Sequence, residues 1–340
     1  ISSNVNAQQN LRINQLQVIG SHNSYKKEIE PNLYQFLEQK DSSNNLKALQ
    51  YAHISIPEQL TLGLRNLEID VYADTKGGRY ATPKGIELVK PTETYDPNKV
   101  MLEPGFKMLH VLDIDFRSHY YTLVACLQDL KKWSNAHPKH EPVFITLEAK
   151  DGSYNGFGTE PEEFTKELFN QLDASLINYL GKEKIIIPDD VRGHFSTLKE
   201  AVLNNNWPKL KKARGKFLFI LDDTGSKRDM YIKDHPSLQG RVLFVNADPE
   251  TPEAATLLLN DPRDENILKL VKKGYIIRTR ADSATKEART NDYSRFEKAK
   301  ESGAQIISTD YYYPSTFFKS EYQISFKNKT YVRNNPITKK

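Results

Sequence analysis

The feature that most constrains the fold is a series of short apolar, β-branched segments along nearly all of the 340 residues. Helical patterns, with apolar residues every three or four positions, separate most of these segments. The predicted strands cover residues 16–20, 64–71, 106–111, 143–147, 216–221, 242–245, 275–279 and 305–308. The clearest predicted helices cover residues 120–135, 162–180, 197–213, 265–273 and 293–302. This alternation predicts either a doubly wound sheet or a closed barrel.

Polar side chains stand at or just beyond the end of every predicted strand. They are His22, Glu68, Asp70, His110, Glu148, Asp222, Asp223, Asn246, Arg278, Arg280 and Asp310. The strand ends of a barrel converge on one mouth, whereas an open sheet spreads them along a line. The sequence therefore favours a (β/α)8 TIM barrel. Gly274 and Gly303 stand where C-cap glycines would end the helices before the last two strands.

Length and composition fit one large domain, because 38% hydrophobic and 27% charged residues are ordinary for a globular protein. We expect a single catalytic barrel domain over residues 1–340, with a loop insertion at 74–104 and a tail at 325–340. Loops as long as this insertion are usually functional or disordered. We interpret it either as a substrate lid at the mouth or as variable decoration.

Charge and cysteine content exclude some classes of partner and say little about the compartment. A formal net charge of +4 does not suggest nucleic acid. No run approaches the roughly 18 apolar residues that span a bilayer, which leaves only peripheral membrane contact, and no obligate protein partner is evident. Cys126 permits no intrachain disulfide and fits a small buried apolar position.

The start at Ile1, without an initiator Met, is typical of a processed mature end. We expect a secreted, periplasmic or cell-envelope protein whose signal peptide has been removed.

A candidate cation site comes from four oxygen-bearing side chains. Glu68 and Asp70 are alternate residues of one predicted strand, so both carboxylates point to the same face. Standing alone, they would more simply be salt-bridged to neighbouring basic residues. Asn23 and Glu148, at the ends of other strands, complete an all-oxygen set. Hard cations prefer such oxygens, whereas Zn²⁺ usually recruits His or Cys, so the predicted cofactor is Ca²⁺, with Mg²⁺ as the alternative.

Two histidines accompany this set. His22 directly precedes Asn23, and His110 ends the third predicted strand. Either histidine alone could be a packed structural residue. Two imidazoles beside a hard cation suit phosphodiester cleavage, in which charge develops on phosphoryl oxygens and the leaving oxygen needs a proton.

These segments resemble the catalytic half of the calcium-dependent phosphatidylinositol-specific phospholipases C, in the same chain order. They are residues 18–25 (VIGSHNSY), residues 67–71 (LEIDV), His110 and residues 145–148 (ITLE). Residues 276–282 (IIRTRAD) and 306–312 (IISTDYY) are similar to the barrel-closing segments of bacterial members. The resemblance therefore covers nearly the whole chain and implies a barrel of the phospholipase C-like phosphodiesterase type.

The resemblance also implies an activity and roles for the residues. The implied reaction cleaves a phosphatidylinositol-like phosphodiester into a phosphorylated, cyclic or open, headgroup and diacylglycerol. Calcium would be held by Asn23, Glu68, Asp70 and Glu148. One of the two histidines would stabilise the pentacovalent phosphorus, and His110 would be the general acid. The general base maps to Glu68 or Asp70, and the choice stays open.

Further along the chain, three basic side chains are candidates for binding phosphate. Arg278 and Arg280 carry the planar fork of donors that suits phosphate, and Lys150 lies two residues beyond Glu148. The alternatives are ordinary salt bridges for the arginines and a surface position for the lysine. The aromatic residues at 311–318 either cover the barrel, stack on a sugar ring or enter a lipid interface.

The sequence lacks some modules of other family members, and three other functions are alternatives. The sequence shows no pleckstrin, EF-hand or C2 module, so we expect a lone catalytic domain without an implied preference for polyphosphorylated headgroups. The nearest alternative function is that of a glycerophosphodiester phosphodiesterase. Those enzymes have a His-Arg-Gly motif at the first strand, whereas Asn23 follows His22 here. A glycoside hydrolase would leave both histidines without a role. A non-catalytic headgroup-binding barrel is the third alternative.

Overall fold

A computed structural model of the chain describes residues 11–152 and 158–338, so the predicted processed start at Ile1 lies outside the described residues. The strands are β1 (Leu16–Ser21), β2 (Asn66–Tyr72), β3 (Val143–Lys150), β4 (Phe217–Leu221), β5 (Phe244–Val245), β6 (Thr256–Leu258), β7 (Ile276–Arg280), β8 (Ile306–Thr309) and β9 (Val332–Asn334).

In this part of the chain, β1 to β8 form a nearly closed barrel of parallel strands in the order β5-β4-β3-β2-β1-β8-β7-β6. One parallel bridge between Asn246 and Thr256 links the two ends of this order. The strands are almost fully buried, as expected for parallel strands covered by helices. The predicted (β/α)8 barrel is confirmed.

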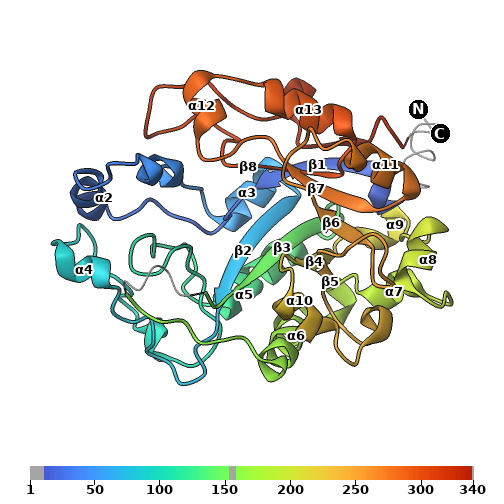
Figure 1. The fold of residues 1–340 in the computed structure, drawn as a ribbon. Helices are drawn as coiled ribbons and strands as arrows, with labels where there is room; N and C mark the ends of the chain where they lie inside the picture. Colours follow the sequence, from blue (N-terminus) through green and yellow to red (C-terminus); the bar gives the residue numbers. More distant parts are fainter. Residues whose placement is uncertain (1–10, 153–157, 339–340) are drawn as a thin grey trace.

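Helices surround the barrel (Figure 1). The α-helices are α2 (Pro31–Glu38), α3 (Ile56–Leu62), α4 (Lys84–Leu88), α5 (Leu123–Ala136), α6 (Lys166–Leu180), α7 (Pro188–Arg192), α8 (Leu198–Leu203), α9 (Leu210–Ala213), α10 (Ser226–Ile232), α11 (Asn266–Lys273), α12 (Lys286–Thr290) and α13 (Ser294–Ser302). The 3-10 helices are η1 (Ile13–Gln15), η2 (Asn45–Leu49), η3 (Val100–Leu102), η4 (Lys182–Lys184), η5 (Pro236–Leu238) and η6 (Lys327–Lys329).

One strand prediction was wrong, and one strand was missed. Residues 106–111 do not form a barrel strand, because their backbone makes only isolated antiparallel bridges, such as the one between Tyr72 and Lys107. The sixth barrel strand, β6, was missed because its three residues are too short to give a periodic signal. Consequently His110 lies on a connection after β2, and Glu148 lies on the third strand of the barrel instead of the fourth.

The helix predictions were confirmed except at one point. The predicted helix at 197–213 is interrupted, so that α8 and α9 are separate elements, and Pro208 stands in the connection between them. Gly274 and Gly303 are the predicted C-caps, with left-handed φ values of 105° and 78°.

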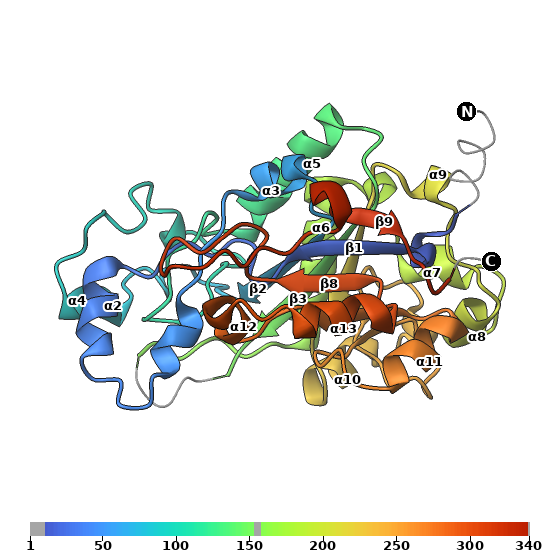
Figure 2. The same cartoon turned by 90° about the horizontal axis from the view of Figure 1, so that it is seen from above.

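The connections that follow β1 and β2 extend away from the barrel. Figure 2 shows α2 and α4 side by side, beyond the carboxyl end of β1. Residues 74–104, predicted as a loop insertion, contain α4 and pack on α2 through a small apolar cluster that includes Leu33, Tyr80 and Met101. The predicted tail contains β9, which pairs antiparallel with β1.

One glycine sets the close approach of β1 and β2. Gly20 pairs with Asn66, and a Cβ atom at Gly20 would lie 2.0 Å from the Asn66 carbonyl oxygen. This packing brings the residue after β1, His22, next to Glu68 of β2.

Among the described helices, none combines the length and apolar character needed to cross a membrane.

Candidate active site

His22 follows β1 directly, and the backbone around it is pinned on both sides. The His22 amide donates to the Thr309 carbonyl oxygen of β8 at 3.1 Å. On the other side, two hydrogen bonds of 2.8 Å join Ser24 and Glu68. The Ser24 amide donates to the Glu68 carbonyl oxygen, and the Glu68 amide donates to Ser24 Oγ. The imidazole is therefore held at the mouth between β2 and β8.

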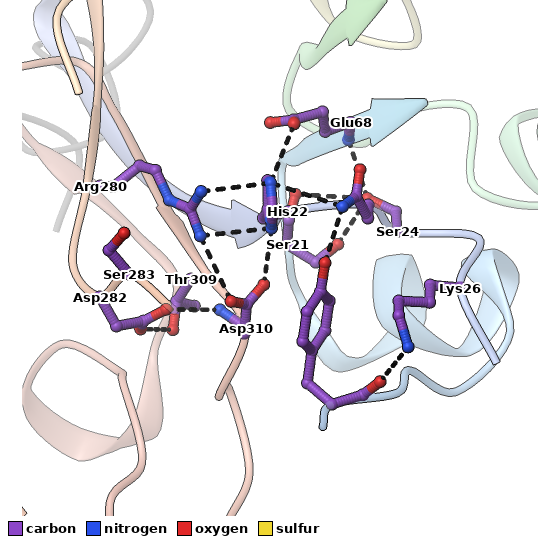
Figure 3. Close-up of polar contacts among 12 residues, drawn as sticks. Ser21, His22, Ser24, Lys26, Glu68, Arg280, Asp282, Ser283, Thr309 and Asp310 are labelled. Atoms are coloured by element: carbon purple, nitrogen blue, oxygen red, sulfur yellow. Dashed lines mark hydrogen bonds and ion pairs between the residues drawn. The ribbon is translucent and has the colours of Figure 1, made fainter. Parts of the chain in front are cut away.

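Three charged side chains enclose the His22 ring (Figure 3). Nδ1 lies 2.8 Å from Asp310 Oδ1, and Nε2 lies 3.4 Å from Glu68 Oε1. The Arg280 guanidinium lies 3.2 Å from both ring nitrogens and also donates to Asp310 Oδ2 at 3.2 Å. Burial, followed by the Arg280 charge, holds the pKa of His22 well below its ordinary value. The hydrogen bond to Asp310 as the acceptor places a proton on Nδ1 of the ring.

His110 is held by a second aspartate. Its Nδ1 lies 2.7 Å from Asp115 Oδ2, and Lys26 Nζ lies 3.3 Å from the same oxygen. Both Asp115 and Lys26 are fully buried. This fixed partner orients the His110 ring and leaves its Nε2 for chemistry at the mouth.

Tyr51 connects the two histidines. Its ring centroid lies 5.8 Å from that of His22 and 6.3 Å from that of His110. Its hydroxyl accepts a hydrogen bond of 2.7 Å from Asn23 Nδ2, which leaves the Asn23 amide oxygen available to another partner. Asn23 has a left-handed φ of 47°, a conformation that asparagine tolerates better than most residues. His22, Asn23 and His110 are thus gathered around one aromatic ring.

The three predicted carboxylate ligands lie at the same mouth and are paired with cations. Glu68 Oε2 accepts from Arg278, whereas Asp70 and Glu148 lie 3.3 Å and 3.5 Å from Lys150 Nζ. Burial would raise the pKa of Glu68, but the positive charges around it, that of Arg278 foremost, bring this pKa below its ordinary value. The predicted phosphate-binding cations, Lys150 and Arg278, therefore contact carboxylates here.

Asp70 is the least satisfied of these acids. It is 1% exposed, and neither of its carboxylate oxygens has a hydrogen-bond partner. Burial raises its pKa to about 6 despite the Lys150 charge. A buried carboxylate that accepts no hydrogen bond is costly unless a cation compensates its charge. Lys150 supplies that charge in this structure, and a hard cation bound here would supply it instead.

The donor set, three carboxylates and one amide, also has the chemistry that Ca²⁺ prefers. The carboxylates do not form a ready-made coordination sphere: within residues 11–152 and 158–338, no group of three or more His, Cys, Asp or Glu side chains is close enough to hold a metal. Instead, Lys150 and Arg278 are paired with these acids.

Four further residues of the site were not predicted as site residues. Asp310 was noted only as a strand-end residue, although it holds His22. Tyr51, Lys26 and Asp115 lie on connections, where strand periodicity gives no signal. The one available signal was the short spacing between His110 and Asp115, which lets a loop fold back on itself.

A parallel barrel with two histidine–aspartate pairs and a cluster of carboxylates at its mouth defines a class, the barrel phosphodiesterases. The sequence model described as "Phosphoinositide phospholipase C, Ca2+-dependent" matches residues 11–336. The chain belongs to this family. The protein is therefore a phosphodiesterase of the phospholipase C type, acting on phosphoinositides, with Ca²⁺ as its cofactor.

Solved structures agree with the fold. A calcium-dependent phosphoinositol-specific phospholipase C from a Pseudomonas species, described as an apo form and myoinositol complex, is 15% identical with a TM-score of 0.55, and 97% of each chain is covered. The enzyme from Streptomyces antibioticus is 18% identical with a TM-score of 0.55, covering 88% of this chain and 95% of the other. No curated protein sequence matches the chain.

Proposed function

We propose that Asn23, Glu68, Asp70 and Glu148 bind the calcium ion and that His22 and His110 transfer protons during cleavage of a phosphatidylinositol-type phosphodiester. The observation that carries this proposal is that Asp70, a buried carboxylate whose oxygens accept no hydrogen bond, shares one mouth with two histidines, each held by an aspartate. When bound, calcium would supply Lewis-acid stabilisation of charge on the phosphoryl oxygens.

The histidines have different proton roles in this proposal. His22, neutral and with Nδ1–H directed to Asp310, carries a lone pair on Nε2 and can accept the proton of the attacking hydroxyl. Glu68 and Asp70 remain the other candidates for the base. Glu68 is the weaker one, because Arg278 already donates to it. His110, oriented by Asp115, gives a proton to the leaving glycerol oxygen.

Phosphate binding falls mainly to Arg280 in this proposal. Its guanidinium lies against the His22 ring, so a phosphoryl group that reaches His22 Nε2 also reaches Arg280 donors. Arg278 and Lys150 are further candidates once their carboxylates bind calcium.

The headgroup is proposed to be inositol without further phosphates. The mouth cations Lys150, Lys227, Arg278 and Arg280 are each paired with an acid. Asp222, half-buried after β4, makes no ion pair among the described residues, and the charges of Glu68 and Glu148 act on it together with the opposing charge of Arg278. Each further phosphate on the headgroup would bring more negative charge close to Asp222.

Peripheral membrane contact is proposed for residues 74–104. Leu88 and Leu102 of this segment are 42% and 54% exposed. Such apolar side chains near the mouth would suit a bilayer that carries the substrate.

The test of the proposed function is release of water-soluble phosphate from phosphatidylinositol vesicles, with calcium and with excess chelator, followed by ³¹P NMR of the product. We expect calcium-dependent release of inositol phosphate, with a cyclic phosphate formed first. His110→Ala should lower the rate by about 10²-fold or more, because a general acid contributes about that much. Release that persists in chelator, or that is unaffected by H110A, would contradict the proposal.

A further inference from the structure

Lys150 is mostly buried and lies between two acids at the mouth of the barrel. Glu148 and Lys150 are alternate residues of β3, and Asp70 pairs with Glu148 in the parallel register of β2 and β3. The side chains of Glu148 and Lys150 therefore share a face with Asp70. Lys150 Nζ lies 3.3 Å from Asp70 Oδ2 and 3.5 Å from Glu148 Oε2, and its side chain is 21% exposed.

The ammonium group of Lys150 compensates two acids at once. Burial lowers the pKa of Lys150, but the charges of Asp70 and Glu148 outweigh it and raise the pKa above its ordinary value. Lys150 therefore stays charged at neutral pH. Without it, Asp70 would be a buried carboxylate facing a second carboxylate with no compensating charge.

We infer that Lys150 is an internal counter-ion of the metal-free site, which calcium displaces from Asp70 and Glu148, and that it thereby sets the affinity for calcium. This inference rests on the proposed calcium ligands. A divalent cation bound to the two carboxylates repels an ammonium group held between them, so the metal and Lys150 compete for the same oxygens. Calcium binding must break both ion pairs, which weakens the apparent affinity.

Lys227 provides a matched control at the same rim. Its Nζ lies 2.7 Å from Asp223 and 3.3 Å from Asp151, and its side chain is 22% exposed. Neither of its acidic partners is a proposed calcium ligand. Replacing Lys227 removes one positive charge from the mouth without releasing Asp70 or Glu148.

The first experiment is calorimetric titration of calcium into wild type, Lys150→Met and Lys227→Met, without substrate. Calcium does not have to break any ion pair with residue 150 in K150M, so this variant should bind calcium about tenfold more tightly than wild type. K227M should stay within about threefold of wild type, since only the long-range field changes. An unchanged or weaker affinity in K150M overturns the inference. Failure of the wild-type protein to bind calcium overturns the proposed metal site itself.

A second experiment needs no variant, in case K150M does not fold. Lysine acetylation of the wild-type protein, followed by peptide mass mapping, is compared in chelator and in saturating calcium. The Lys150 acetylation rate should rise at least about threefold in calcium, because its ion pairs are broken, whereas Lys227 should not change. A Lys150 rate that is equal or lower in calcium overturns the inference.

Discussion

Each histidine at the mouth is fixed through the same ring atom. Nδ1 of His22 lies 2.8 Å from Asp310, and Nδ1 of His110 lies 2.7 Å from Asp115. Since the tautomer of an imidazole is set by the hydrogen bond of its other nitrogen, both rings present Nε2 to a substrate. At the scale of single residues, the chemistry therefore depends on the aspartates as much as on the histidines.

Asp310→Asn tests this dependence. The amide cannot stabilise the charge that develops on His22 and can support the wrong tautomer, so kcat should fall by about 10²-fold while KM changes less than about threefold. Steady-state kinetics on phosphatidylinositol micelles would measure both constants. The exposed Asp229 gives the control, because D229N should leave both unchanged. An Asp310→Asn enzyme with wild-type kcat would show that His22 needs no aspartate.

The sequence was informative for residues that follow strands and uninformative for those on connections. His22, Glu68, Asp70 and Glu148 could be predicted because parallel strands deliver their ends to one mouth. Tyr51 could not, because nothing in the local pattern of residues 45–51 indicates that the chain returns to the mouth. The pairing of Lys150 and Arg278 with acids was also unpredictable, since it depends on side-chain distances across strands.

At the scale of elements, the close contact of β1 and β2 positions the site. It requires glycine at position 20, where a Cβ atom would clash with the backbone of Asn66. The same reasoning explains the wrong strand at 106–111. These residues have β propensity, but they pair in isolated bridges with β2 and the start of α5 and stay outside the barrel.

Gly20→Ala should therefore destabilise the protein by about 2 to 4 kcal/mol, because overpacking at a backbone contact forces the strands apart. Urea unfolding, monitored by circular dichroism, would measure the difference. Gly152→Ala is the control, since a Cβ atom there meets nothing within 4 Å, and its effect should stay within about 0.5 kcal/mol. Equal effects of the two substitutions would contradict the packing argument.

The whole molecule carries a buried histidine remote from the mouth, His140, which makes its stability depend on pH. Burial lowers the pKa of His140 to about 4 from an ordinary value of 6.5. The unfolded chain then binds more protons than the folded protein between about pH 4 and 6.5. The contribution of His140 to stability is complete above pH 6.5 and is lost as the pH falls through this window.

His140→Gln should reduce the acid sensitivity of the fold. Between pH 7.5 and 5.0, the loss of unfolding free energy should be smaller in H140Q than in wild type by about 2 kcal/mol, at 1.36 kcal/mol for each pKa unit. Urea unfolding in chelator at both pH values would measure this difference and keep calcium binding out of it. Parallel losses in the two proteins would mean that His140 is not buried as a neutral ring.

The proposed site brings calcium, the histidines and the substrate phosphate together at one mouth. Its most direct test is the calcium dependence of headgroup release by wild type and Asp70→Asn. Loss of this buried carboxylate should raise the calcium concentration for half-maximal activity by about 10²-fold, since a charged ligand is replaced by a neutral one. An Asp70→Asn enzyme with wild-type calcium dependence would contradict the proposed site.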